Sequence, residues 1–129
     1  AVIGSRLLGA RERGEAIPRT VFRLGGDFIN WVFQVLYRSR LTDVASCYKL
    51  APTAVFRSLE LRCDGFDLDY ETAGKLLLLA RQRGERVVEL PIQYRPRTAA
   101  EGKKIRWHDG LQALKTLWRS RLWKPAAGK

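Results

Sequence analysis

The chain has 129 residues, and its 24 Lys and Arg against 13 Asp and Glu give a net charge of +11. Hydrophobic residues make up 46% and charged residues 29%, a balance that predicts one packed domain and excludes a disordered polyelectrolyte. The longest apolar runs, around residues 32–37 and 76–80, are far shorter than the roughly 20 residues that cross a bilayer. Two cysteines, Cys47 and Cys63, are too few for a disulfide scaffold, so we expect buried thiols in a reducing compartment.

Basic residues gather at the two ends of the chain. Residues 1–40 hold seven Arg against three acidic residues, and residues 94–129 hold ten basic residues against two acidic ones. The centre, residues 41–93, is nearly neutral, with seven basic and eight acidic residues. Such a field attracts anions, whether nucleic acid, an anionic lipid surface or a phosphorylated small molecule. The alternative is a solvated basic face with no partner.

The first third of the chain predicts a strand, a loop and a long helix. Residues 1–3 are apolar and end in a Gly-Ser-Arg loop, which is typical of the end of a buried strand. Residues 7–17 are rich in Gly and charge and predict a loop. The chain then turns helical from Pro18 to Tyr37. The part of this helix from Phe28 to Tyr37 is apolar almost all round, with a polar stripe of Asp27, Asn30, Gln34 and Arg38, so the rest of the protein or a membrane surface must cover it.

The middle of the chain predicts two helices and an edge strand. Residues 42–49 read as a loop entering a strand, and Pro52 opens a helix to about Leu61. Residues 67–83 predict the clearest helix, because acidic residues occupy its first turn and basic residues and a Gly its end. Residues 87–94 predict a strand, which Pro91 assigns to an edge or a bulge.

The last third predicts a basic loop over residues 95–106 and an amphipathic helix over about residues 111–122. The whole pattern, about three strands and four helices, indicates an α/β fold. A parallel sheet needs several strands and cover on both faces, so this number of elements fits half of a larger sheet. The apolar start of the chain likewise reads like the middle of a fold.

Six short motifs follow one another in an order that points to a known family. They are Gly4-Ser5-Arg6, Leu41-Thr42-Asp43, Ser46-Cys47-Tyr48-Lys49, Gly65-Phe66-Asp67, the segment 89–94 with Arg97, and Glu101-Gly102-Lys103-Lys104-Ile105. In this order the chain resembles the family 2 glycosyltransferases. The branch that it resembles includes dolichyl-phosphate mannose synthases and bacterial polyprenyl-phosphate glycosyltransferases, and the resemblance covers roughly residues 1–122.

This resemblance implies a partial GT-A fold, the nucleotide-diphospho-sugar transferase sandwich. Residues 1–122 would form its C-terminal, acceptor-side half, and residues 123–129 a flexible basic tail. The family's N-terminal half supplies the nucleotide pocket and the aspartates that hold a divalent metal, Mg or Mn. The metal ligands are therefore expected outside this chain, and the chain alone is expected to be inactive.

The activity that the resemblance implies is an inverting transfer of a mannose- or glucose-type hexosyl group. The donor would be a nucleotide-diphosphate sugar and the acceptor dolichyl or polyprenyl phosphate. The enzyme would be a cytoplasmic protein, peripheral at the inner face of the membrane. Within the same class, the alternative acceptor is a sugar hydroxyl.

The resemblance also implies site residues. Asp43 matches the family's catalytic aspartate, a general base or a group that orients the acceptor. The residues that match acceptor- or diphosphate-binding positions are Arg6, Arg19, Arg97, Lys103 and Lys104. A phosphate monoester is mostly a dianion at pH 7, so a lipid phosphate requires positioning and neutralisation more than deprotonation. The structural alternatives are that Asp43 caps the following segment and that the basic loop is simply solvated.

Other residues are better explained by structure than by chemistry. Asp67-Leu68-Asp69 spells the D-x-D string of metal-binding transferases, but it begins a helix, where acidic residues stabilise the dipole. We therefore assign no metal ligand. His108, next to a Trp at a helix start, is interpreted as structural.

The tryptophans and the charge leave two further alternatives. The four tryptophans are predicted to lie mostly in the core, although Trp118 and Trp123, set among basic residues, also suit a lipid headgroup surface. A small basic nucleic-acid-binding module is the alternative function. The neutral centre and the lack of a nucleic-acid motif argue against it, so no nucleic-acid partner is favoured.

Overall fold

A three-stranded sheet and five α-helices make up the part of the computed structural model that is described, residues 1–17, 20–95, 100 and 106–125. In chain order they are β1 (Val2–Ser5), α1 (Arg6–Glu12), α2 (Val21–Tyr37), β2 (Lys49–Leu50), α3 (Thr53–Ser58), α4 (Leu68–Gln82), β3 (Val88–Pro91) and α5 (Trp107–Arg121). The predicted α/β class is confirmed.

The sheet has β1 at its centre, in the order β2-β1-β3. β1 pairs antiparallel with β2, with Val2 opposite Leu50, and parallel with β3, where Val2 faces Val88 and Ser5 faces Pro91. The edge position predicted for β3 is confirmed, and the proline is the last residue of the strand. Because proline donates no backbone hydrogen bond, it fits the end of an edge strand.

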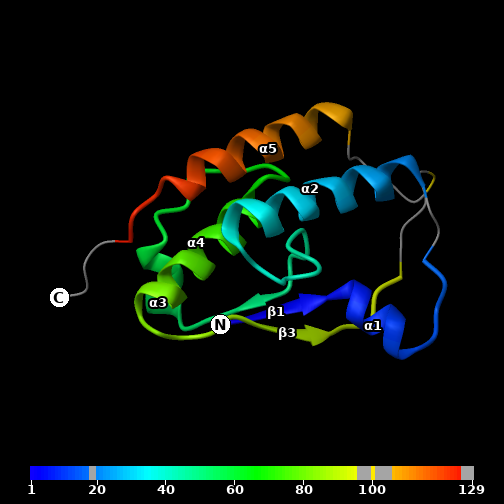
Figure 1. The fold of residues 1–129 in the computed structure, drawn as a ribbon, viewed down its shortest axis with the longest axis horizontal. Coiled ribbons are helices and arrows are strands. Elements are labelled where there is room, and N and C mark those ends of the chain that lie inside the picture. Colours follow the sequence, from blue (N-terminus) through cyan, green and yellow to red (C-terminus); the bar gives the residue numbers. More distant parts are fainter. Residues whose placement is uncertain (18–19, 96–99, 101–105, 126–129) are drawn as a thin grey trace.

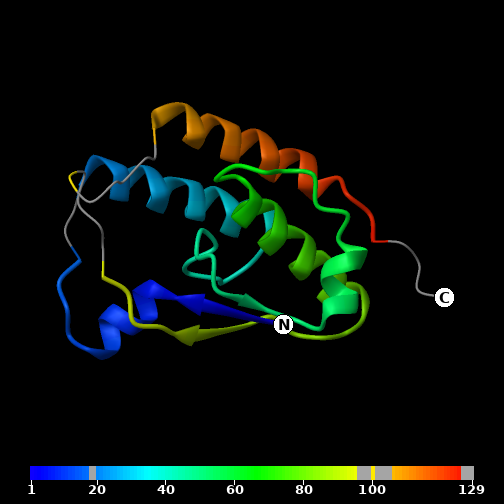
Figure 2. The same cartoon turned by 180° about the vertical axis from the view of Figure 1, so that it is seen from behind.

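Helices α2, α4 and α5 lie over one face of the sheet (Figures 1 and 2). The core lies between these helices and the sheet, and its buried members are Ile3, Ile29, Phe33, Tyr37, Leu41, Val44, Tyr70, Ala73, Leu77, Ala113 and Leu117. The register aligns Val88 and Leu50 with Val2, on the other face from Ile3. Leu50 and Val88 are 70% and 47% exposed, so among the described residues only one face of the sheet is covered.

The long helices begin and end where local chemistry favours it. The Thr20 hydroxyl accepts the Arg23 N–H at 3.2 Å at the start of α2. The helix ends at Tyr37, and its C-cap, Arg38, has a left-handed φ of 48°. Gly84, with a φ of 66°, follows α4 as predicted. α3 is shorter than predicted, ending at Ser58, and the chain takes a φ of 49° at Glu60, which no helix can contain.

The loop predicted over residues 7–17 is wrong, because α1 occupies its first half. The Ser5 hydroxyl accepts the Leu8 N–H at 3.1 Å and caps the helix. Gly9 reads as a helix breaker in the sequence, yet a Cβ at this position would lie 2.0 Å from the Ile92 carbonyl oxygen. The glycine therefore serves the close approach of α1 to the segment after β3, a contact that composition does not reveal.

The core position predicted for most tryptophans is wrong. Trp31, Trp107 and Trp118 are 57%, 76% and 64% exposed. Their helical spacing identifies an apolar side of a helix, but it does not say whether another layer covers that side. The buried position predicted for Cys47 is also wrong, since this thiol is exposed.

Candidate functional site

The candidate site centres on an ion pair between Arg6 and Asp43. Arg6 begins α1 directly after β1, and Asp43 lies in the loop that follows α2. The Arg6 Nε donates to Asp43 Oδ2 at 2.8 Å, and its Nη2 donates to Oδ1 at 2.7 Å. The backbone N–H of Arg6 also donates to Oδ2 at 2.8 Å. This paired, planar geometry is the strongest form of an arginine–carboxylate contact.

The pair is sheltered from water unequally. The side chain of Asp43 is 6% exposed and that of Arg6 is 32% exposed, so the arginine presents the accessible edge of the pair. The hydrogen bond to Asp43 raises the pKa of Arg6 further above its ordinary value, against the effect of burial. The guanidinium carbon also lies 5.1 Å from the centroid of the Tyr94 ring, a cation–π contact that restrains it. Arg6 is thus a fixed cation at the edge of the site.

The backbone of the Asp43 loop is held from β3 by Glu89. The Glu89 carboxylate accepts the N–H of Thr42 at 2.8 Å and the N–H of Asp43 at 2.9 Å. It also accepts the Thr42 hydroxyl at 3.1 Å, and that hydroxyl lies 2.9 Å from the hydroxyl of Ser5. Glu89 therefore orients the loop that presents Asp43 to Arg6.

The polar stripe predicted on α2 holds the same loop from the opposite side. The amide of Gln34 donates to the Leu41 carbonyl at 2.9 Å, and the amide of Asn30 donates to the same oxygen at 3.3 Å. Asn30 also accepts the Val44 N–H at 3.2 Å. The two amides of the stripe therefore fix the backbone on both sides of Asp43, while Asp27 and Arg38 at its ends are exposed.

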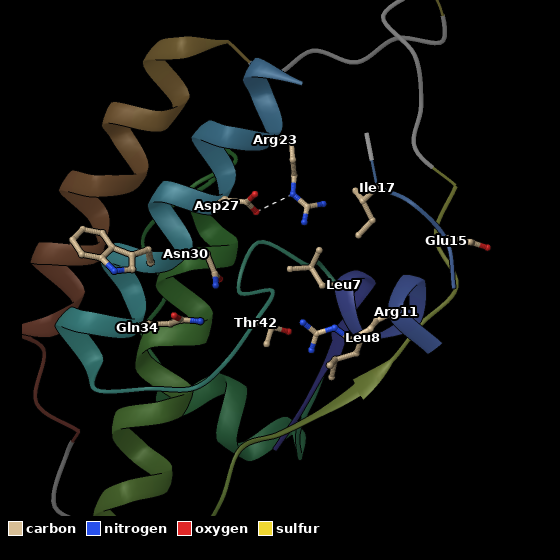
Figure 3. Close-up of a pocket in the computed structure, with 11 residues that line it drawn as sticks. Leu7, Leu8, Arg11, Glu15, Ile17, Arg23, Asp27, Asn30, Gln34 and Thr42 are labelled. Atoms are coloured by element: carbon tan, nitrogen blue, oxygen red, sulfur yellow. Dashed lines mark hydrogen bonds and ion pairs between the residues drawn. The ribbon is translucent and has the colours of Figure 1, made fainter. Parts of the chain in front are cut away.

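A pocket of about 520 Å³ lies between α1 and α2. Thr42, the residue before Asp43, lines it, whereas Arg6 and Asp43 themselves do not. Figure 3 shows Leu7 from α1 and Arg23 from α2 pointing toward each other across it. Its lining is completed by Leu8, Arg11, Glu15, Ile17, Asp27, Asn30, Trp31, Gln34 and Thr42. This size is within the range of small-molecule sites.

The pocket lining holds two arginines, Arg11 and Arg23, and two carboxylates, Glu15 and Asp27, both of which are already paired. Asp27 pairs with Arg23 at 2.8 Å, and Glu15 pairs with Arg13, outside the lining, at 2.7 Å. Arg11 makes no ion pair with any residue that the structure describes. A cation with no ion pair among the described residues, beside leucine, isoleucine and tryptophan side chains, suits a ligand with a negative head and an apolar tail.

Of the predicted site residues, the structure brings together Arg6 and Asp43. The other four, Arg19, Arg97, Lys103 and Lys104, lie outside the described residues, as does most of the predicted basic loop. Sequence reasoning missed Glu89, Asn30 and Gln34 as site residues. Glu89 could have been noticed because it is a charged residue inside a predicted strand. Asn30 and Gln34 could have been noticed because they recur at helical spacing in the polar stripe.

The D-x-D string lies at the start of α4, as predicted, but Asp67 makes no capping hydrogen bond and both carboxylates contact other elements. Asp67 accepts the Thr116 hydroxyl of α5 at 2.6 Å, and Asp69 pairs with Lys49 at 2.8 Å. The two carboxylates therefore serve different elements. No group of three or more His, Cys, Asp or Glu placed to hold a metal occurs within the described parts of the chain.

Comparisons with protein-family models, with curated proteins and with solved structures found no match for this chain. The family therefore stays a prediction that rests on the motifs. Across the residues with described positions, no helix is both long and apolar enough to cross a bilayer.

Proposed function

We propose that this chain is the acceptor-side part of a GT-A glycosyltransferase. The enzyme transfers a hexosyl group, with inversion, from a nucleotide-diphosphate sugar to a polyprenyl or dolichyl phosphate. The observation that carries the proposal is the fixed Arg6–Asp43 pair near a pocket that combines apolar walls with Arg11, which has no ion pair among the described residues. A phosphorylated lipid offers the matching combination of charge and hydrocarbon.

In this proposal Asp43 orients an arginine and does not act as a general base. Both of its oxygens already accept hydrogen bonds from Arg6, so its negative charge is engaged by the guanidinium. The guanidinium has five N–H donors, of which Nε and one on Nη2 go to Asp43. Three donors are left for other partners, namely Tyr94 and, in this proposal, a phosphate. Asp43 is thus a positioning residue, and Arg6 is the group that meets the anion.

The chemistry suits this division of roles. A phosphate oxygen of the acceptor attacks the anomeric carbon, a new carbon–oxygen bond forms, and the bond to the donor's β-phosphate oxygen breaks. The nucleoside diphosphate leaves with that electron pair, and no proton has to be removed from the acceptor dianion. The task of the acceptor side is to hold the dianion and neutralise part of its charge. A divalent metal, Mg or Mn, would neutralise the charge of the leaving diphosphate. Its ligands would lie outside this chain.

The acceptor's location implies where the protein works. Polyprenyl phosphates are held in a membrane by their hydrocarbon, so the proposed enzyme is peripheral at the inner, cytoplasmic face of a membrane. Arg19, Arg97, Lys103 and Lys104 remain the proposed further contacts to the acceptor phosphate and the diphosphate.

The test is binding of a short prenyl phosphate to the full 129-residue chain. Isothermal titration calorimetry with farnesyl phosphate below its micellar concentration should show saturable binding, while farnesol and inorganic phosphate should bind far more weakly. Arg11→Gln leaves the Asp43 pair intact and should weaken binding about tenfold, the loss expected for one charge-assisted contact. Arg57→Gln, on α3, is the matched control and should bind normally.

Two results would reject the proposal. One is equal affinity for farnesol and farnesyl phosphate. The other is equal weakening by Arg11→Gln and Arg57→Gln, which would mean that net charge alone attracts the ligand. Binding to RNA that falls steeply with salt would instead favour the nucleic-acid alternative.

A further inference from the structure

Tyr94 contacts the proposed anion-binding arginine but does not belong to the core. The guanidinium carbon of Arg6 lies over the Tyr94 ring, 5.1 Å from its centroid, and the tyrosine is 43% exposed. Burial of apolar surface therefore does not account for the position of this ring. The charge of Arg6 does not require it either, since Asp43 already balances that charge.

The backbone after β3 brings Tyr94 to Arg6. The Ile92 N–H donates at 3.1 Å to the carbonyl of Ser5, the residue directly before Arg6. α1 approaches the same segment so closely that a Cβ on Gly9 would lie 2.0 Å from the Ile92 carbonyl oxygen. Tyr94 follows two residues after this anchored point, so the fold limits where its ring can lie.

Asp43 occupies one of the two donor edges of the Arg6 guanidinium. A guanidinium presents paired N–H groups along the edge of Nε and one Nη, and again along the edge of its two Nη nitrogens. Asp43 accepts from Nε at 2.8 Å and from Nη2 at 2.7 Å, which is the first edge. No second carboxylate pairs with Arg6 among the residues that the structure describes. Because the side chain of Asp43 is only 6% exposed and that of Arg6 is 32% exposed, the accessible part of the arginine lies away from the carboxylate.

We propose that Tyr94 is a positioning residue of the anion site, and that it holds Arg6 so that the edge of its two Nη nitrogens meets two oxygens of a phosphate. The inference rests on the proposed function, which makes Arg6 the group that meets the anion. Paired N–H donors match two oxygens of one phosphate, so the direction of this edge decides how well a phosphate binds. Tyr94 touches the arginine and not the phosphate.

A fixed arginine binds an anion more tightly than a freely rotating one. A long side chain loses rotamer freedom when a ligand immobilises it, and that loss weakens binding. Here Asp43 and Tyr94 restrain Arg6 before any ligand arrives. The hydrogen bond to Asp43, and to a smaller extent the contact with Tyr94, also raise the pKa of Arg6, so the guanidinium keeps its charge.

β3 and its continuation orient both members of the ion pair. Glu89, in β3, accepts the backbone N–H of Asp43 at 2.9 Å, and Tyr94, beyond the end of the strand, contacts Arg6. The carboxylate and the arginine are therefore set by two residues of one short stretch of chain. This arrangement suits a role in orientation, because it aligns the two partners with each other as well as with the ligand.

The experiment titrates methyl phosphate, a monoester without a hydrocarbon tail, into the isotope-labelled full chain. NMR of the arginine Nε–H groups should show a saturable shift of the Arg6 signal. Tyr94→Leu should weaken this binding about threefold to tenfold, the effect of losing a cation–π contact. Tyr94→Phe keeps the ring and should bind like the wild type. Tyr48→Leu removes another exposed tyrosine and is the matched control, which should also bind normally.

A second measurement separates positioning from a merely structural role. Calorimetry with farnesyl phosphate uses a background variant that combines Arg6→Gln with Asp43→Asn, which removes the ion pair without leaving a buried charge. Arg11 and the apolar walls should retain measurable binding in this background. Adding Tyr94→Leu should then change the affinity by less than about twofold, because Tyr94 acts through Arg6. Circular dichroism checks that every variant remains folded.

The outcomes separate this inference from the proposed function. The inference would be overturned by an Arg6 signal that does not shift, by equal effects of Tyr94→Leu and Tyr48→Leu, or by equal loss with and without the ion pair. Equal weakening by Tyr94→Phe and Tyr94→Leu would also overturn it, because the hydroxyl would then bind the phosphate directly. Ring-dependent binding of methyl phosphate at Arg6, with no affinity gained from the farnesyl chain, would reject the proposed function alone. Farnesyl phosphate binding that depends on Arg11 and ignores Tyr94 would reject this inference alone.

Discussion

The Glu89 carboxylate accepts the backbone N–H of Asp43 at 2.9 Å, so a strand residue fixes the backbone of the aspartate that pairs with Arg6. The same carboxylate accepts the Thr42 N–H and hydroxyl. A single edge strand thus controls the geometry of a loop that is more than forty residues away in the sequence.

Glu89→Gln should destabilise the chain by about 2 kcal/mol, because the amide has one acceptor oxygen in place of two and its NH₂ group would face backbone N–H donors. Urea denaturation followed by circular dichroism measures this change. Glu85→Gln is the matched control, since this exposed residue makes only a backbone hydrogen bond. Equal effects of the two substitutions would mean that the carboxylate of Glu89 does not hold the loop.

The Arg6–Asp43 pair should show strong energetic coupling. Arg6→Gln leaves a buried carboxylate without its partner, and Asp43→Asn removes the charge that the guanidinium meets. A double-mutant cycle of these substitutions should give a coupling energy of about 1–3 kcal/mol in urea denaturation. Arg6→Lys should recover little of it, because an ammonium group cannot make the paired contact. Additive effects of the two single substitutions would contradict the geometry described above.

The sequence predicted the helices better than it predicted their surroundings. α2, α4 and α5 were found because apolar period, capping residues and charge agree within each segment. α1 was missed because the approach of Gly9 to Ile92 joins residues that are distant in the chain. The exposed tryptophans were misassigned for the same reason, since an apolar side of a helix looks alike in sequence whether or not another layer covers it.

The candidate site was predicted only in its charged centre. Arg6 and Asp43 were named from motifs, and the structure brings them together. The contacts that orient them, from Glu89, Asn30 and Gln34, depend on how β3 and α2 approach one loop. The local sequence pattern does not show how β3 and α2 pack against the Asp43 loop, so these three residues could be identified only from the fold.

The buried Glu71–Lys75 pair should control stability in acid. Burial alone would raise the pKa of Glu71, but hydrogen bonds from Lys75 and from the backbone N–H groups of Cys63 and Arg62 lower it to about 2 from 4.5. Because the folded-state pKa lies below the unfolded one, the stability that Glu71 contributes is fully present above pH 4.5. It is lost as the pH falls toward 2, and it amounts to about 3 kcal/mol.

Urea denaturation at pH 7 and pH 3 checks this expectation. Glu71→Gln should be less stable than the wild type at pH 7, and the difference should shrink at pH 3. Glu85→Gln should follow the wild type at both values. A difference between Glu71→Gln and the wild type that stays constant with pH would show that the Glu71 charge is not what stabilises the pair.

Gly9→Ala should destabilise the chain by about 2 kcal/mol or more, although alanine favours helices. The new Cβ would lie 2.0 Å from the Ile92 carbonyl oxygen, so α1 and the segment after β3 would have to separate. Gly25→Ala, in α2, meets no atom within 4 Å and should stabilise by about 0.5–1 kcal/mol through helix propensity alone. Thermal denaturation of the two variants therefore should shift in opposite directions. If Gly9→Ala also raised the melting temperature, the close packing of α1 against residue 92 would be wrong, and with it the position of Arg6 at the start of that helix.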